Sequence, residues 1–136
     1  MRAIPVFVMS AVATMAFAFP ASAAAIDASV ALQPQARLEA RGAAVTVPMR
    51  VMCANGASGS LWVQVTQNVR GELAVGDRYA PSVPCSGRFH KVDVTVVSRT
   101  KAFRPGVAFT SATLNVFLAP DGSGVAEENR EMTIVR

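Results

Sequence analysis

Residues 43–53 read AAVTVPMRVMC, and apolar side chains occupy every second position of this stretch. Such alternation predicts a half-buried β-strand, because successive side chains of a strand point to opposite faces of its sheet. Pro48 within the stretch indicates an edge position or a bulge, since proline has no N–H to donate. The face expected to be buried carries Val45, Val47, Met49, Val51 and Cys53.

The same alternation recurs on both sides of this stretch, between turns rich in glycine, proline and asparagine. No amphipathic helix and no internal repeat interrupts it. Short strands at this spacing predict an all-β protein, with an immunoglobulin-like two-sheet antiparallel β-sandwich as the expected fold and an open β-barrel as the alternative. The further strands are expected at residues 29–38, 61–69, 71–75, 89–97, 107–118 and 130–135.

Several short motifs carry a resemblance that extends over nearly all of the chain after residue 23. They are VTVPMRVMC at 45–53, VQVTQ at 63–67, CSG at 85–87, VDVTV at 92–96, FRPG at 103–106, ATL at 112–114 and REMTI at 130–134. On these motifs the chain resembles a group of small, uncharacterised secreted bacterial proteins with an immunoglobulin-like β-sandwich. The resemblance implies a fold and an exported location, and it implies no activity and no site residues.

The first 23 residues have the layout of a secretory signal peptide. Arg2 supplies a positive start, residues 4–19 are mostly apolar, and Ala21-Ser22-Ala23 forms a small-residue cleavage site. Cleavage is expected after Ala23, with Ala25 as the alternative. A single domain is then expected over residues 24–136, secreted or retained in the periplasm or at the cell envelope, with no transmembrane segment.

Cys53 and Cys85 are the only cysteines of the chain. In an exported protein, two cysteines predict one disulfide bond. Closing a loop of this length is expected to stabilise the fold by roughly 3–4 kcal/mol. A redox or metal-binding thiol pair is disfavoured, because neither a CxxC spacing nor a histidine cluster is present.

The charge of the chain is mildly basic. Of its 13 lysines and arginines only Arg2 falls in the signal peptide, so 12 basic residues remain against 9 acidic ones. They are spread along the chain without a basic helix or a nucleic-acid-binding motif, so no nucleic-acid partner is expected. A loop group of Arg99, Lys101 and Arg104 could still attract an anionic envelope polymer.

Trp62 is the second candidate for a binding surface. If Val63 and Val65 face the core, Trp62 points outward, where an exposed indole can stack on a sugar ring or anchor a protein interface. The alternative is that the segment Gly71–Ala80 covers this strand and buries Trp62.

Catalytic and metal-binding arrangements find little support in the sequence. Ser98-Arg-Thr-Lys101 matches an S-x-x-K pattern, but the accompanying motifs of that enzyme class are missing. His90 is the only histidine, and no nucleophile elbow accompanies it. An oxygen-rich turn around Asp121 does not match a calcium loop. We therefore expect no enzyme activity, no cofactor and no metal.

These observations predict an exported, non-enzymatic binding or structural module. Its partner is expected to be an envelope polymer or another exported protein, met by Trp62, Arg99, Lys101 and Arg104. The alternative is a secreted carrier of a small ligand or an enzyme inhibitor. An open apolar cleft would favour the carrier, and a rigid loop near a cysteine would favour the inhibitor.

Overall fold

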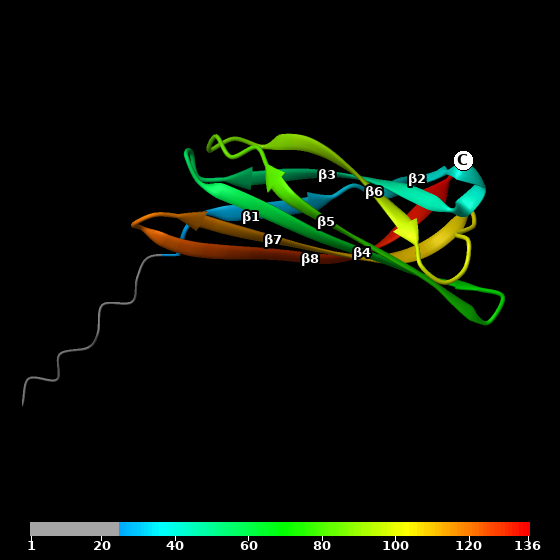
Figure 1. Cartoon of the computed structure of the whole chain (residues 1–136). Helices are drawn as coiled ribbons and strands as arrows, with labels where there is room; N and C mark the ends of the chain where they lie inside the picture. The colour runs from blue at the N-terminus through cyan, green and yellow to red at the C-terminus, as the bar shows by residue number, and fades with distance from the viewer. Residues whose placement is uncertain (1–24) are drawn as a thin grey trace, which may run out of the picture.

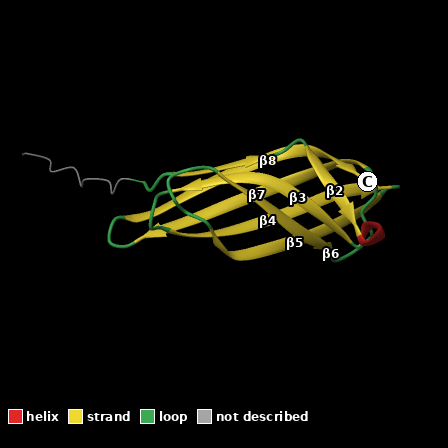
Figure 2. Cartoon of the chain, turned by 90° about the horizontal axis from the view of Figure 1, so that it is seen from above, coloured by secondary structure: helices red, strands yellow, loops and turns green. Residues whose placement is uncertain are grey.

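A computed structural model describes residues 25–136, and the expected signal peptide at 1–23 lies outside these residues. Strands make up most of the described chain, as Figure 2 shows. A short 3₁₀ turn, η1 (Ala40–Gly42), separates the second and third strands. The strands are β1 (Ala28–Leu32), β2 (Gln35–Glu39), β3 (Ala44–Cys53), β4 (Ser58–Val69), β5 (Glu72–Val83), β6 (His90–Ser98), β7 (Gly106–Leu118) and β8 (Gly122–Val135).

The strands form one sheet that closes on itself (Figure 1). Around the ring the order is β3, β2, β8, β7, β4, β5 and β6, and the pairing of β6 with β3 completes it. All pairs are antiparallel except β2 with β8, which run parallel. The described residues therefore form a closed seven-stranded β-barrel, with β1 as an additional strand along β3.

This topology confirms the expected all-β class and refines its architecture. The continuous hydrogen-bonded ring agrees better with the barrel alternative than with two separate sheets, and the immunoglobulin-like sandwich is not shown. The ring is closed, whereas the alternative expected from the sequence is an open barrel. β3 pairs with β2 on one edge and with β6 on the other, which completes the ring. Pro48 therefore does not mark an edge strand of the sheet.

A break in the first expected strand explains how β3 accommodates Pro48. The stretch expected as one strand at 29–38 divides at Gln33 and Pro34, and both halves pair with the same edge of β3. The Gln33 N–H donates to the Pro48 carbonyl at 3.1 Å. The N and O atoms of a strand residue point to the same side, so the missing N–H of Pro48 faces this break.

β8 begins eight residues earlier than the strand expected at 130–135. Glu128 and Arg130 occupy alternate positions on the inward side of this strand. Because they are polar, this part of the sequence does not show the alternation of apolar and polar residues that predicts a strand. Both side chains bind the end of β1: the Leu32 N–H donates to the Glu128 carboxylate, and Arg130 Nη1 donates to the Leu32 carbonyl at 3.0 Å. These side chains satisfy backbone groups that have no strand partner there.

The barrel interior is filled by small and medium apolar side chains. The alternating residues of β3 from Val45 to Cys53 are fully buried, as the sequence predicted. Phe103, which lies between the strands expected at 89–97 and 107–118, is also fully buried and is one of the largest side chains of the core. Its N–H donates to the Gly42 carbonyl at 2.8 Å, which holds the 99–105 loop against η1.

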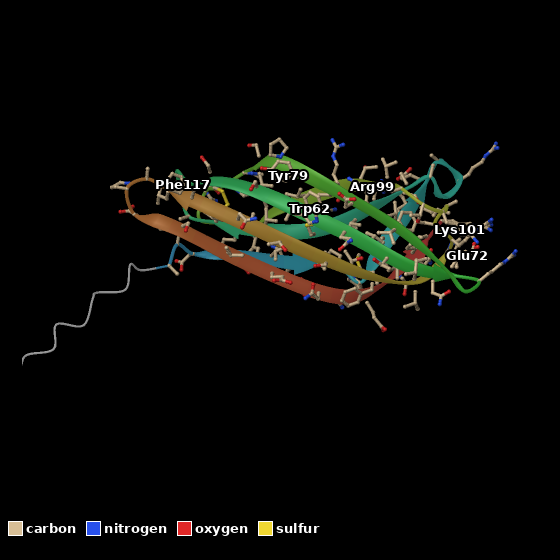
Figure 3. The ribbon with its side chains drawn as sticks, turned by 60° about the horizontal axis from the view of Figure 1, so that its bottom comes forward. Trp62, Glu72, Tyr79, Arg99, Lys101 and Phe117 are labelled. Carbon is tan, nitrogen blue, oxygen red and sulfur yellow. A yellow bond between two sulfur atoms is a disulfide. The ribbon has the colours of Figure 1, made fainter. Side chains whose placement is uncertain are left out.

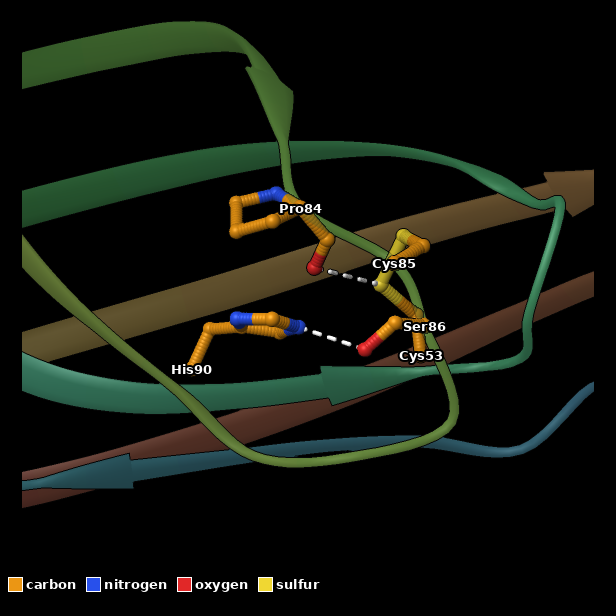
Figure 4. The surroundings of a disulfide bond; sticks show 5 residues. All are labelled: Cys53, Pro84, Cys85, Ser86 and His90. Atoms are coloured by element: carbon orange, nitrogen blue, oxygen red, sulfur yellow. Dashed lines mark hydrogen bonds between the residues drawn. A yellow bond between two sulfur atoms is a disulfide. The ribbon is translucent and has the colours of Figure 1, made fainter.

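Cys53 and Cys85 form the expected disulfide bond. It joins the end of β3 to the segment that follows β5 (Figure 4). Gly59 in β4 lies directly against it: a Cβ atom at this position would lie 3.0 Å from the Cys85 sulfur. The crosslink therefore joins two segments at one end of the barrel and packs against a third, β4.

Candidate functional site

The outer surface of β5, β4 and β7 carries the most distinctive side chains of the molecule. Trp62 of β4 is directly paired with Tyr79 of β5, and their ring centres are 6.3 Å apart with a tilted arrangement. Trp62 is 43% exposed and Tyr79 52%. β5 pairs beside β4 and does not cover it, so the alternative in which this segment buries Trp62 is wrong.

Next to this pair the surface is hollowed. Tyr79 and Phe117 lie on its two sides, and Figure 3 shows Trp62, Tyr79 and Phe117 along the same face. We call Trp62, Tyr79 and Phe117 the aromatic face. The hollow has a volume of about 410 Å³ and is lined by Ser58, Gly59, Ser60, Tyr79, Pro81, Asn115, Val116, Phe117, Ser123, Gly124 and Val125.

The hollow combines apolar rings with hydroxyl and amide groups. Ser60 and Asn115 are direct cross-strand partners, and both contribute to its lining. On the far side of Trp62, Gln64 pairs with Asp77. Because β-strands hold these side chains at fixed spacing, the surface presents its rings and hydrogen-bonding groups in a defined pattern.

The basic residues expected to form a second surface are partly neutralised. Arg99 Nε lies 2.7 Å from an Asp77 carboxylate oxygen, and Lys101 Nζ is paired with the Glu72 carboxylate. The Lys101 hydrogen bond, reinforced by the lysine charge, lowers the pKa of Glu72. Two of the three expected cations therefore have acidic partners, which weakens their attraction for a polyanion.

Arg104 differs from Arg99 and Lys101 in the contacts that it forms. Its backbone is held by the buried Gln67 side chain: the Arg104 N–H donates to Oε1 at 2.9 Å, and Nε2 donates to the Arg104 carbonyl at 2.8 Å. Its side chain is exposed and forms no ion pair among the residues that the structure describes. The expected basic group is thus one free cation and two paired ones.

The structure brings Trp62 and Arg99 onto one side of the molecule. Asp77, which binds Arg99, is two residues from Tyr79 along β5 and points to the same face. Lys101 and Glu72 lie toward the opposite end of that face in Figure 3. The sequence analysis did not identify Tyr79 or Phe117. Had the strand expected at 71–75 been extended to residue 79, its pairing with the preceding strand would have placed Tyr79 beside Trp62.

A second opening lies between β5 and β6. These strands pair only at Gly76 with Ser98 and at Asp77 with Val97, and they diverge beyond that point. We call the space between them the β5–β6 slot. It has a volume of about 460 Å³ and is lined by Arg78, Ala80, Ser82, Val83, Pro84, Val92, Asp93, Val94, Thr95 and Val97.

Close to the disulfide, Ser86 Oγ lies 2.6 Å from His90 Nε2 (Figure 4). This is the spacing of a nucleophile and its base, but in the described residues no carboxylate forms a hydrogen bond with the other His90 nitrogen. No group of three or more potential ligands (His, Cys, Asp or Glu) for a metal occurs among residues 25–136. Within that same range, no helix has the length and apolar character to cross a membrane.

Comparisons with known proteins do not assign the chain to a family. No protein-family model matches it, and no curated protein matches its sequence. Among solved structures, the chain is similar to Spo0M, a sporulation control protein from Bacillus subtilis, with a TM-score of 0.36 and 12% identity. The alignment covers 83% of this chain and 50% of that one, so the chain spans half the length of Spo0M. A similarity this low carries no argument about function.

Proposed function

We propose that the protein is an exported, non-enzymatic binding module that holds a polysaccharide of the cell envelope on its aromatic face. The observation that carries the proposal is the cross-strand pair of Trp62 and Tyr79, two exposed rings on neighbouring strands. Exposure of large aromatic side chains to water is unfavourable, and it commonly marks a surface that a partner covers. Trp62 and Tyr79 also carry an N–H and an O–H group that can form hydrogen bonds with such a partner.

The chemistry around the rings supports a sugar in preference to an apolar ligand. The C–H face of a sugar ring packs on an aromatic ring, while its hydroxyls require hydrogen-bonding groups at the sides. Ser60, Gln64 and Asn115 supply hydroxyl and amide groups next to the rings. The surface is an open, shallow hollow, which suits a long polymer that passes over it.

The test is cosedimentation of the disulfide-intact protein with isolated bacterial envelopes and with lipid-free polysaccharide prepared from them. Trp62 is the only tryptophan, so its fluorescence reports directly on the proposed contact. We expect binding that resists high salt and shifts the Trp62 emission. Trp62→Ala and Tyr79→Ser should each weaken binding by about tenfold, because each removes one packed ring.

Leu73→Ala is the matched control, because Leu73 is 58% exposed on the same hairpin but lies at its far end. It should leave binding unchanged. Binding that high salt abolishes and that Arg104→Gln removes would instead assign the contact to the basic loop. Absence of binding to both preparations would overturn the proposal.

A second candidate function, carriage of a small apolar ligand, is favoured by the β5–β6 slot. Its volume is within the range of ligand sites, and valines from both strands line it. Ala80→Phe should fill the slot and abolish binding of a fatty-acid probe while leaving envelope binding intact. If the unmodified protein binds no such probe, this candidate is eliminated. An inhibitory role has no comparable observation in its favour.

A further inference from the structure

A second groove lies on the outer surface of β3 and β6, three strands around the ring from β4. It forms where the chain breaks between β1 and β2, because the break leaves part of β3 without a neighbouring strand. We call it the basic groove. Its volume is about 430 Å³, and it is lined by Gln33, Pro34, Gln35, Pro48, Arg50 and Lys91.

Two cations face each other in this groove. Arg50 of β3 is directly opposite Lys91 of β6 in the antiparallel register, and both side chains are exposed. Like charges at directly opposed positions destabilise a strand pair. A pair that costs stability and whose side chains line a groove indicates that a ligand of opposite charge offsets the repulsion.

The surrounding acidic groups do not neutralise these cations. Asp93, the next outward residue of β6, is opposite Pro48 and forms no ion pair with Arg50 or Lys91. Glu39 of β2 is committed to Arg37, with the Arg37 Nε 2.7 Å from Oε1. Among the described residues, Arg50 and Lys91 therefore retain unpaired charges that point into the groove.

The donors of the groove are partly held in place. The Arg50 guanidinium carbon lies 5.3 Å from the centre of the Phe89 ring, a cation–π contact that restricts the arginine side chain. Gln33 and Gln35 flank the groove, and neither side chain has a hydrogen-bond partner among residues 25–136. Arginine, lysine and amide side chains that line one groove supply the donors that an oxyanion requires.

We infer that the basic groove binds an oxyanion, a phosphate or carboxylate group of a small molecule or of a polymer, through Arg50 and Lys91 with the amides of Gln33 and Gln35. Arg50 binds two oxygens through its planar edge, and Lys91 contributes its charge from the neighbouring strand. This site is independent of the aromatic face, so either proposal can fail without the other.

The test is a titration of the disulfide-intact protein with inorganic phosphate and, separately, with sodium acetate. The ionic strength is held constant with sodium chloride, and backbone amide chemical shifts are followed by NMR. We expect saturable shifts confined to the break between β1 and β2 and to the facing residues of β3 and β6. Arg50→Gln and Lys91→Gln should each weaken the affinity by about tenfold, as loss of a charge-assisted hydrogen bond predicts.

Arg70→Gln is the control, because Arg70 is an exposed arginine at the turn between β4 and β5, outside the groove. It should titrate like the unmodified protein. In the absence of anion, Lys91→Gln should also raise the midpoint temperature of unfolding, because it removes the repulsion from Arg50. A variant that binds anion more weakly but unfolds at a higher temperature has lost binding without losing its fold. Non-saturating shifts, or shifts that chloride alone reproduces, would overturn the inference. Saturation with phosphate only or with acetate only would support it and identify the oxyanion.

Discussion

At the scale of single residues, buried polar groups have a structural function here. Gln67 is 4% exposed, and its amide forms three hydrogen bonds with the backbone of Arg104 and Val107. These bonds attach the loop before β7 to β4. A buried side chain that satisfies several backbone groups contributes more than its own packing, because its loss leaves those groups unpaired.

Gln67→Leu should therefore destabilise the protein by about 1–3 kcal/mol, the cost of leaving buried hydrogen-bonding groups without partners. The measurement is urea denaturation followed by circular dichroism. Gln64→Ala is the control on the same strand, because its side chain is exposed and should change the unfolding free energy by less than about 0.5 kcal/mol. Equal effects of the two substitutions would refute the function assigned to Gln67.

The ion pair between Glu72 and Lys101 predicts a weak pH dependence. The Lys101 hydrogen bond lowers the pKa of Glu72 below its ordinary value of 4.5, so the folded state favours the ionised carboxylate. The associated stability is present above the ordinary pKa and is lost as the pH falls through the lowered one. Thermal unfolding should show the protein slightly more stable than Glu72→Gln at neutral pH, and no difference in strong acid. A difference that persists in acid would contradict this linkage.

At the scale of elements, the contact between η1 and the loop that carries Phe103 closes one end of the barrel. Gly42 has a φ of 97°, and a Cβ atom there would lie 2.2 Å from the Phe103 carbonyl oxygen. Glycine is required at this position for two reasons: the positive φ angle of the backbone and the close approach of the loop.

Gly42→Ala should destabilise the protein by about 1–3 kcal/mol more than Gly56→Ala, as expected for overpacking. Gly56 is the matched control, since its φ of 80° is also positive but no atom lies within 4 Å of its expected Cβ. Both variants carry the conformational cost, so their difference isolates the collision with Phe103. Chemical denaturation of the two proteins measures it. Similar unfolding free energies would show that the loop moves away without cost.

The elements also show where sequence alternation is informative and where it is not. It predicted β3, β4 and β7 well, because their inward positions are almost all apolar. It missed the first half of β8, where Glu128 and Arg130 occupy inward positions and bind the end of β1. It also missed most of β5, where Gly76-Asp77 and Pro81 resemble turn residues. In β8 the polar residues bind the neighbouring β1, and in β5 the absence of a side chain at Gly76 lets the backbone of β6 approach closely.

At the scale of the whole molecule, one covalent bond joins segments that are distant along the chain. Cys53 and Cys85 are 32 residues apart. In the chain-entropy view, the crosslink stabilises the fold chiefly by restricting the unfolded chain.

Reduction of the disulfide, or the double substitution Cys53→Ala and Cys85→Ala, should lower the unfolding free energy by about 3–4 kcal/mol. Denaturation curves with and without reductant measure this change. The double variant provides the control, because reductant should have no effect on it. An unfolding free energy unchanged by reduction would contradict the stabilising function of the bond.

The candidate sites depend on the whole molecule in a different way. Trp62 could be expected to point outward, because its neighbours Val63 and Val65 alternate with polar residues. Its pairing with Tyr79 requires the register of the β4–β5 hairpin. The basic groove requires three segments of the chain: the break between β1 and β2, the middle of β3, and the start of β6. The break lies along one edge of β3, and β6 lies along the other edge. No local pattern contains that information.

By itself, the sequence determined the all-β class, the disulfide and the buried faces of the regular strands, because each depends on local alternation or on the number of cysteines. Only the tertiary structure decided that the sheet closes into a barrel, that Phe103 lies in the core, and that Arg99 and Lys101 have acidic partners. These features depend on strand register and on contacts between residues far apart in the chain. Side-chain periodicity records which face of a strand is buried, but it does not record which strand lies beside it.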